Sequence, residues 1–143
     1  VLTTNDNGQV VYAINSKLTP KTYTAKVSYL GNDDYAGSAT TSKVVVKKAT
    51  PVVTAKSATF KVKTKTKKYT VTLKNNVNKV IKNAKVYITV KGKTYKAVTD
   101  SKGKAVFKIT KLTKKGKYTA KVTYYGNTYY NKVVKSVKIT VKK

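Results

Sequence analysis

The chain repeats itself at an interval of 95 residues. Residues 23–35 read YTAKVSYLGNDDY and residues 118–130 read YTAKVTYYGNTYY, with nine of thirteen positions identical. The same interval pairs Gly8 with Gly103 upstream and Val46 with Val141 downstream. A period of this length matches a whole β-sandwich domain better than one unit of a solenoid. The repeat therefore predicts tandem modules of about 95 residues: the C-terminal half of one, truncated module at 1–48, and a complete module at 49–143.

Within the complete module, apolar and polar residues alternate with the period of a half-buried strand. No segment shows a helical period, and glycine- or asparagine-containing turns separate the alternating runs. In the turn at residues 100–103, Asp comes first and Gly last, which is typical of a tight turn whose aspartate accepts a backbone hydrogen bond. The pattern predicts an antiparallel sandwich of seven or eight strands, with the clearest runs at 58–62, 69–73, 84–90, 95–99, 105–109, 118–124 and 137–141.

Several residue types needed for catalysis are absent. The chain has no His and no Cys, so it lacks the commonest general base and any thiol nucleophile or thiolate ligand. Its only acids are four Asp, and no Ser or Thr belongs to a recognisable nucleophile motif. Asp33 and Asp34 have no acidic counterparts in the second copy, which argues against calcium binding as a property of the repeat. We therefore predict no enzymatic activity, no cofactor and no metal site.

The segment T-D-S-K-G-K-A-V-F-K-I-T-K-L-T-K-K-G-K-Y-T-A-K-V (99–122) resembles bacterial-type immunoglobulin-like repeats. The following Y-x-G-N-x-x-Y (124–130) is similar to repeats of archaeal adhesin-like cell-surface proteins. The resemblance covers 49–143 and, more weakly, 1–48, where Pro20 replaces the glycine of a turn. It implies an all-β, immunoglobulin-like antiparallel sandwich, an extracellular location at the cell surface, and a string of modules that contact their neighbours and serve adhesion or spacing.

Lysine dominates the charge of the chain, and its distribution is uneven. The net charge is +28; residues 1–48 carry six Lys and three Asp, whereas residues 49–143 carry 26 Lys and one Asp. A charge run is usually a solvated face, but self-repulsion on this scale costs stability unless counterions or a polyanion offset it. We therefore predict contacts with an anionic cell-wall polymer or glycan from two clusters: Lys61, Lys63, Lys65, Lys67 and Lys68, and Lys111, Lys114, Lys115 and Lys117.

The tyrosines divide into two groups. Those common to both copies, such as Tyr118 and Tyr124, share the apolar phase of a strand and are predicted to be structural, with Tyr130 in the core or at a corner. Tyr125 and Tyr129 correspond to Leu30 and Asp34 in the first copy. Because the repeat does not require them, we predict that these two make aromatic contacts with a ligand.

Nonspecific nucleic-acid binding is the alternative function, because clustered lysines neutralise phosphates and release counterions. Against it, the chain has no Arg, the residue that most often reads guanine edges. The longest apolar runs, such as 10–14, are about five residues, far short of the roughly 20 that a membrane-spanning helix needs. The first half-module also lacks the strands that would cover its apolar face. It is therefore expected to be exposed, to dock on the second module or to pair with another chain.

Overall fold

The computed structural model describes residues 1–143 and is all β, as the alternating pattern predicts. The chain divides into two compact units, Val1–Lys47 (unit 1) and Lys48–Lys143 (unit 2). Unit 1 contains β1 (Lys21–Tyr29) and β2 (Ser38–Val46). Unit 2 contains β3 (Val52–Thr54), β4 (Ala58–Lys61), β5 (Lys67–Lys74), β6 (Lys85–Val90), β7 (Lys93–Val98), β8 (Lys104–Ile109), β9 (Gly116–Tyr124) and β10 (Val133–Lys142). No helix has the length and apolar character needed to span a bilayer.

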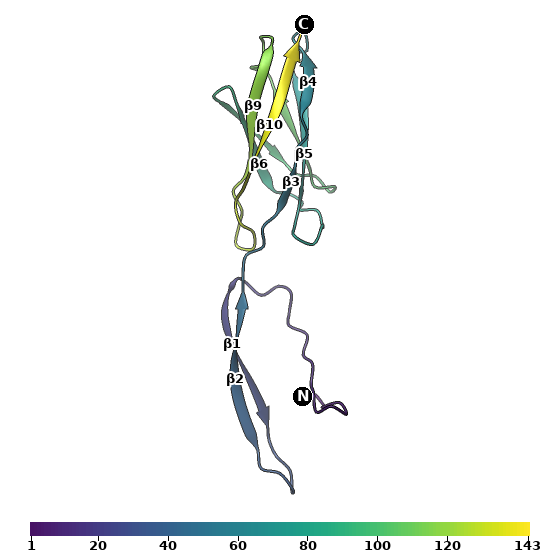
Figure 1. The fold of residues 1–143 in the computed structure, drawn as a ribbon, viewed down its shortest axis with the longest axis vertical. Coiled ribbons are helices and arrows are strands. Elements are labelled where there is room, and N and C mark those ends of the chain that lie inside the picture. Colours follow the sequence, from purple (N-terminus) through teal and green to yellow (C-terminus); the bar gives the residue numbers. More distant parts are fainter. The chain divides into compact units, whose positions relative to one another are not determined.

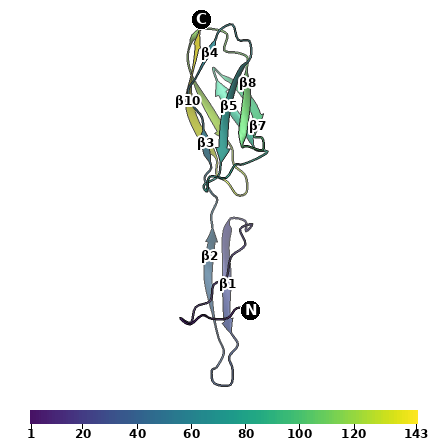
Figure 2. The ribbon, with the colours of Figure 1, turned by 90° about the vertical axis from the view of Figure 1, so that its right-hand side faces the viewer.

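Unit 2 consists of two sheets. One has the strand order β4-β10-β9-β6-β7 and the other the order β3-β5-β8 (Figures 1 and 2). Along β5 and β8 buried and exposed residues alternate, because successive side chains point to opposite faces of a sheet. The buried set forms one hydrophobic core with members from both sheets, among them Leu73, Ile88, Phe107, Val122 and Ile139.

The prediction of an antiparallel sandwich is correct for every strand pair but one. β4 runs parallel to β10, with Ala58 opposite Ile139 and Phe60 opposite Val141. The reason is that the first strand of the module is divided: β3 pairs with β5 in the smaller sheet, and the chain then passes through residues 55–57 to β4 in the larger one. The sequence pattern missed β3, since a three-residue strand with only Val53 buried is too short to show alternation.

Unit 1 is a hairpin of β1 and β2 preceded by a segment without strands. The hairpin has the register of β9 and β10: Lys21 pairs with Val46 as Gly116 pairs with Val141, residue for residue at the interval of 95. Residues 10–14, which correspond to β8, form no strand. In unit 2 β8 is held by β5, and unit 1 contains no equivalent of β5, so the backbone groups of this segment have no ladder to join.

Candidate polyanion-binding surface

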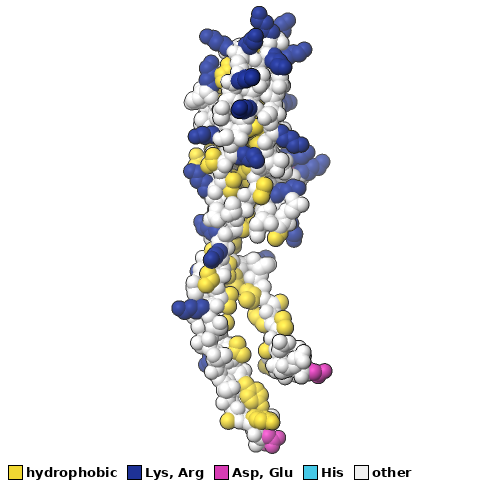
Figure 3. Space-filling model, in the orientation of Figure 1, with side chains coloured by type: hydrophobic (Ala, Val, Ile, Leu, Met, Phe, Trp, Pro, Cys, Tyr) yellow, Lys and Arg dark blue, Asp and Glu magenta, His cyan; other side chains and the backbone are white.

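The structure brings the two lysine clusters together at one end of unit 2. The ends of β4 and β10 meet there, because Lys61 pairs with Lys142 and the Val62 amide donates a hydrogen bond to the Lys142 carbonyl over 2.7 Å. β8 ends where β5 begins, and β9 begins beside the end of β10. We call this surface the lysine end; its exposed members from the predicted set are Lys61, Lys63, Lys65, Lys68, Lys111, Lys114, Lys115 and Lys117. Figure 3 shows lysine side chains crowded over unit 2.

Lys67 does not belong to this surface, and its prediction as a polyanion contact is wrong. Only 2% of Lys67 is exposed, and its Nζ donates a hydrogen bond to the Thr64 carbonyl over 2.7 Å. The cause is the pleat of β5, on which Lys67 falls in the inward phase with Tyr69 and Val71. Lys67 and Lys68 are adjacent on β5, and because successive side chains alternate, one of the two must lie on the inner face.

No nearby acidic side chain offsets the positive charge of the lysine end. Asp100 is the only acidic side chain of unit 2, and it lies in the turn between β7 and β8, at the opposite end of the strands. Its Oδ1 accepts hydrogen bonds from the Lys102 and Lys104 amides at 2.8 and 3.0 Å, which confirms the turn role predicted for it. These bonds, that of Lys104 foremost, hold the pKa of the Asp100 carboxyl below its usual value.

The predicted aromatic contacts lie far from the lysine end. Tyr125 and Tyr129 are exposed in the connection between β9 and β10, and β9 separates them from the lysine end by roughly 27 Å at the usual rise per residue. The structure therefore does not join them to the lysine clusters in one site.

Tyr125 does have a partner that the sequence reasoning missed. Its ring meets the Tyr87 ring edge to face, with centroids 5.4 Å apart, and the Nζ of Lys132 lies 5.2 Å from the Tyr125 centroid. The pair lines a shallow cleft of about 340 Å³, together with Asn83 and Asn127. The signal available was that Tyr87 occupies the polar phase of an alternating run, where an aromatic ring faces outward.

Among the tyrosines shared by the two copies, Tyr23, Tyr118, Tyr124 and Tyr130 make structural contacts, whereas Tyr29 and Tyr35 of unit 1 are exposed. The Tyr118 hydroxyl donates to the Lys114 carbonyl over 2.8 Å, and the equivalent Tyr23 hydroxyl donates to the Thr19 carbonyl over the same distance. Tyr118, not Tyr130, thus forms the corner. Tyr130 packs against the core as a half-buried residue. Burial raises the pKa of Tyr124, and the neighbouring Tyr130 raises it further.

No protein-family model and no curated protein sequence matches the chain. Two solved structures resemble it distantly, each with a TM-score of 0.39 over 85% of this chain. One is a 1.5-MDa bacterial ice-binding adhesin studied for its retention at the host cell surface, 13% identical. The other is a Ca²⁺-stabilised adhesin with which an Antarctic bacterium reaches out and binds ice, 14% identical. The aligned part is 42% and 32% of those chains, so this chain spans less than half the length of either.

Proposed function

We propose that the chain is part of a cell-surface structural or adhesive protein built from tandem immunoglobulin-like modules. Three features support an immunoglobulin-like module. The first strand is divided between two sheets. A tyrosine at the start of the penultimate strand donates its hydroxyl to the backbone four residues upstream, as in the corner typical of such sandwiches. The hairpin register also recurs in unit 1 at the interval of 95 residues.

The function assigned to the complete module is to hold an anionic wall polymer or glycan at its lysine end. The observation that carries the proposal is that eight exposed lysines, distant in sequence, gather at one end of unit 2 while its only acidic side chain lies at the other. Such a surface attracts polyanions through bulk electrostatics and does not distinguish their sequences. The remaining lysines of unit 2 extend the positive field over the rest of its surface.

The test compares two variants with equal loss of charge. The first replaces Lys63, Lys65, Lys114 and Lys115 by Gln; the second replaces Lys79, Lys82, Lys102 and Lys104, which are exposed around the opposite end. Binding of each to an anionic wall polymer, a heparin-like glycan and duplex DNA is measured between low and high salt. We expect the first variant to weaken binding more and to reduce the slope of log K against log salt by about 3 to 4 for DNA.

If the two variants weakened binding equally, the result would contradict a localised binding surface, and net charge alone would explain the binding. Lys67→Met serves as a further control. Because the ammonium of Lys67 is buried, its removal should leave the salt slope unchanged. If the glycan or the wall polymer remained bound at high salt while DNA dissociated, the module would be a specific receptor. The Tyr87–Tyr125 cleft would then be the next place to mutate.

A further inference from the structure

Unit 1 exposes an apolar face whose equivalent in unit 2 is fully covered. Tyr12, Ile14 and Val27 are 74%, 53% and 56% exposed, whereas Phe107, Ile109 and Val122, at the equivalent positions, are 0% exposed. The two faces have the same residue pattern and the same hairpin register. What differs is the rest of the module, because in unit 2 β3 and β5 complete the second sheet with β8, and β4 and β6 flank β10 and β9 in their own sheet.

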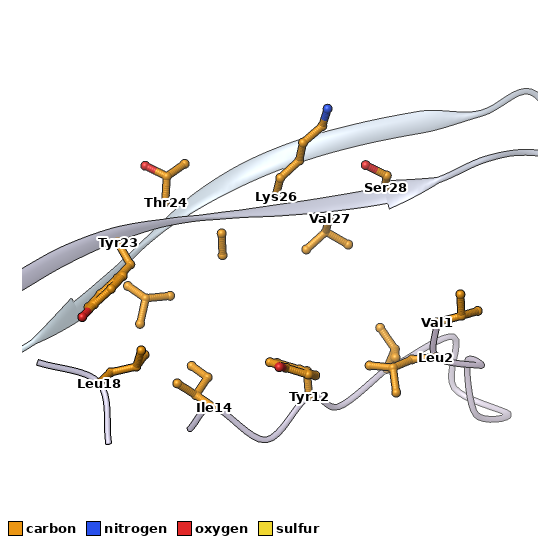
Figure 4. A pocket seen from close by; sticks show the side chains of 13 residues that line it. Val1, Leu2, Tyr12, Ile14, Leu18, Tyr23, Thr24, Lys26, Val27 and Ser28 are labelled. Carbon is orange, nitrogen blue, oxygen red and sulfur yellow. The ribbon is translucent and has the colours of Figure 1, made fainter. Parts of the chain in front are cut away.

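The exposed face of unit 1 forms a groove of about 710 Å³ between the hairpin and the preceding segment. In Figure 4, Tyr23 and Val27 of β1 point into this groove, and Tyr12, Ile14 and Leu18 approach it from the other side. Thr24, Lys26 and Ser28 lie on the opposite side of β1. The groove is therefore the apolar half of a core with its polar exterior already in place.

The free edges of unit 1 specify how a covering segment would pair. In unit 2 the second edge of β9 pairs with β6, with Ile88 opposite Val122. The second edge of β10 pairs with β4, with Ala58 opposite Ile139. At the interval of 95 residues, these positions correspond to Val27 on β1 and Val44 on β2. A strand like β6 can thus extend β1, and a strand like β4 can extend β2, without changing the hairpin.

Residues 1–143 contain one covering segment for two apolar faces. Each copy has two faces to cover, one in each unit, and a single covering segment, residues 49–95, already placed in its own core. A second copy that gave this segment to unit 1 would expose its own unit 2, so the exchange buries no additional apolar surface. Exchange of residues 49–95 between two copies therefore does not cover the face of unit 1, and the free edges of the hairpin favour a separate segment with the same strand pattern.

We infer that the groove of unit 1 is a binding site for a half-module polypeptide with the strand pattern of residues 49–95. The bound segment completes the core, with strands equivalent to β4 and β6 on the outer edges of the hairpin and one equivalent to β5 against residues 10–14. Completion converts residues 10–14 into a strand, because they acquire a hydrogen-bonding partner. This site is independent of the lysine end, so failure of either proposal leaves the other untouched.

The experiment titrates a polypeptide of residues 49–95 into the intact chain and follows amide hydrogen exchange at Ile14 and Val27. With the polypeptide at 100 times its Kd, we expect a 1:1 complex in which exchange at both amides slows by about 100-fold. A polypeptide carrying Ile88→Asp should not bind, because it would place a carboxylate opposite Val27. Val27→Asp in the chain should abolish binding without shifting the melting of unit 2.

Slow exchange at Ile14 and Val27 in the chain alone would overturn the inference. It would show that unit 1 is already covered, by a second copy if sedimentation gave a dimer and by its own unit 2 if it gave a monomer. Binding of a scrambled polypeptide as tight as that of the native one would overturn it as well. If the free polypeptide aggregates, residues 49–95 are joined ahead of Val1 by a peptide bond. If Ile14 is then protected from exchange, and Ile88→Asp in the added copy abolishes the protection, the result supports the site. If Ile14 is not protected, the result contradicts it.

Discussion

At the residue scale, the same turn chemistry recurs through the chain. The side-chain oxygen of Asn5, Asn75 and Asp100 accepts the amides two and four residues further on in each case. Asn5 and Asp100 occupy equivalent positions in the repeat, and each turn includes a glycine of positive φ, Gly8 and Gly103. The turn thus needs a side-chain oxygen that accepts the two amides and a residue with left-handed backbone. It does not need the charge of Asp100, because the neutral Asn5 accepts the same bonds.

Gly103 is expected to be more sensitive to substitution than Gly92, although their φ angles are +73° and +71°. Alanine at either position pays about 1–2 kcal/mol for the left-handed backbone. At Gly103 the new Cβ would also lie 2.8 Å from the Leu73 carbonyl oxygen and 2.9 Å from the Cβ of Val80, whereas at Gly92 it meets nothing. We expect Gly103→Ala to lower the free energy of unfolding by about 1–3 kcal/mol more than Gly92→Ala does, as measured by denaturant unfolding. Equal losses in the two variants would show that the turn at Gly103 relaxes freely.

Asp100 should govern the acid stability of unit 2. Its folded-state pKa lies below the usual 3.8, so it stabilises the fold above that value, and this contribution is lost as the pH falls through the folded pKa. No other acidic side chain of unit 2 titrates there. Asp100→Asn keeps the acceptor oxygen without the charge. Thermal melts should show a smaller loss between pH 7 and pH 2.5 for Asp100→Asn than for the native chain, and parallel losses would contradict this role.

At the element scale, a strand forms only where its partner is present. Residues 10–14 and 105–109 are equivalent in the repeat and both carry strand-forming apolar residues, but only the second set has β5 beside it and becomes β8. A hairpin needs no further segment, because its two strands pair with each other. β1 and β2 therefore form and keep the register of β9 and β10. Local pattern therefore specifies a strand-forming tendency, and a neighbouring strand decides whether it is realised.

The equivalent residues Ile109 and Ile14 provide a matched test of this difference. Ile109→Ala should lower the free energy of unfolding of unit 2 by about 2–5 kcal/mol, because it opens a cavity in a filled core. Ile14→Ala should change it by less than about 0.5 kcal/mol, because that side chain is exposed in a separate unit. Chemical denaturation followed by the signal of unit 2 checks both. A large loss from Ile14→Ala would mean that the two units share a core.

At the scale of the whole molecule, charge and apolar exposure are divided between the two units. Residues 49–143 carry 26 Lys against one Asp, whereas unit 1 has almost balanced charge and exposes most of its apolar face. We therefore expect electrostatic repulsion to lower the stability of the complete module, and the lack of a covering layer to lower that of the half-module. Each condition suggests its own partner, a polyanion for the first and a half-module polypeptide for the second.

Salt should stabilise unit 2. Raising the salt concentration from 0.01 M to 1 M shortens the Debye length from about 30 Å to about 3 Å and screens the repulsion among its lysines. We expect Tm to rise over this range, and to rise less in the variant in which four lysines of the lysine end are replaced by Gln. Calorimetry at fixed pH checks this. A Tm that did not rise would show that repulsion does not limit stability.

The sequence by itself determined the features that depend on neighbouring residues. The interval of 95 residues predicted a module boundary after residue 48, the apolar alternation located the longer strands, and Asp100 was identified as a turn residue from its place before Gly103. The lysine clusters and the two unrepeated tyrosines could be named, but not placed.

Only the tertiary structure decided which of these residues meet. It divided the first strand between two sheets, turned Lys67 into the core phase of β5, and gathered two lysine clusters at one end while leaving Tyr125 and Tyr129 at the other. It also paired Tyr125 with Tyr87. The physical reason is that alternation and turn chemistry are local, whereas sheet membership, strand order and the coverage of a face depend on pairing between segments far apart in the chain.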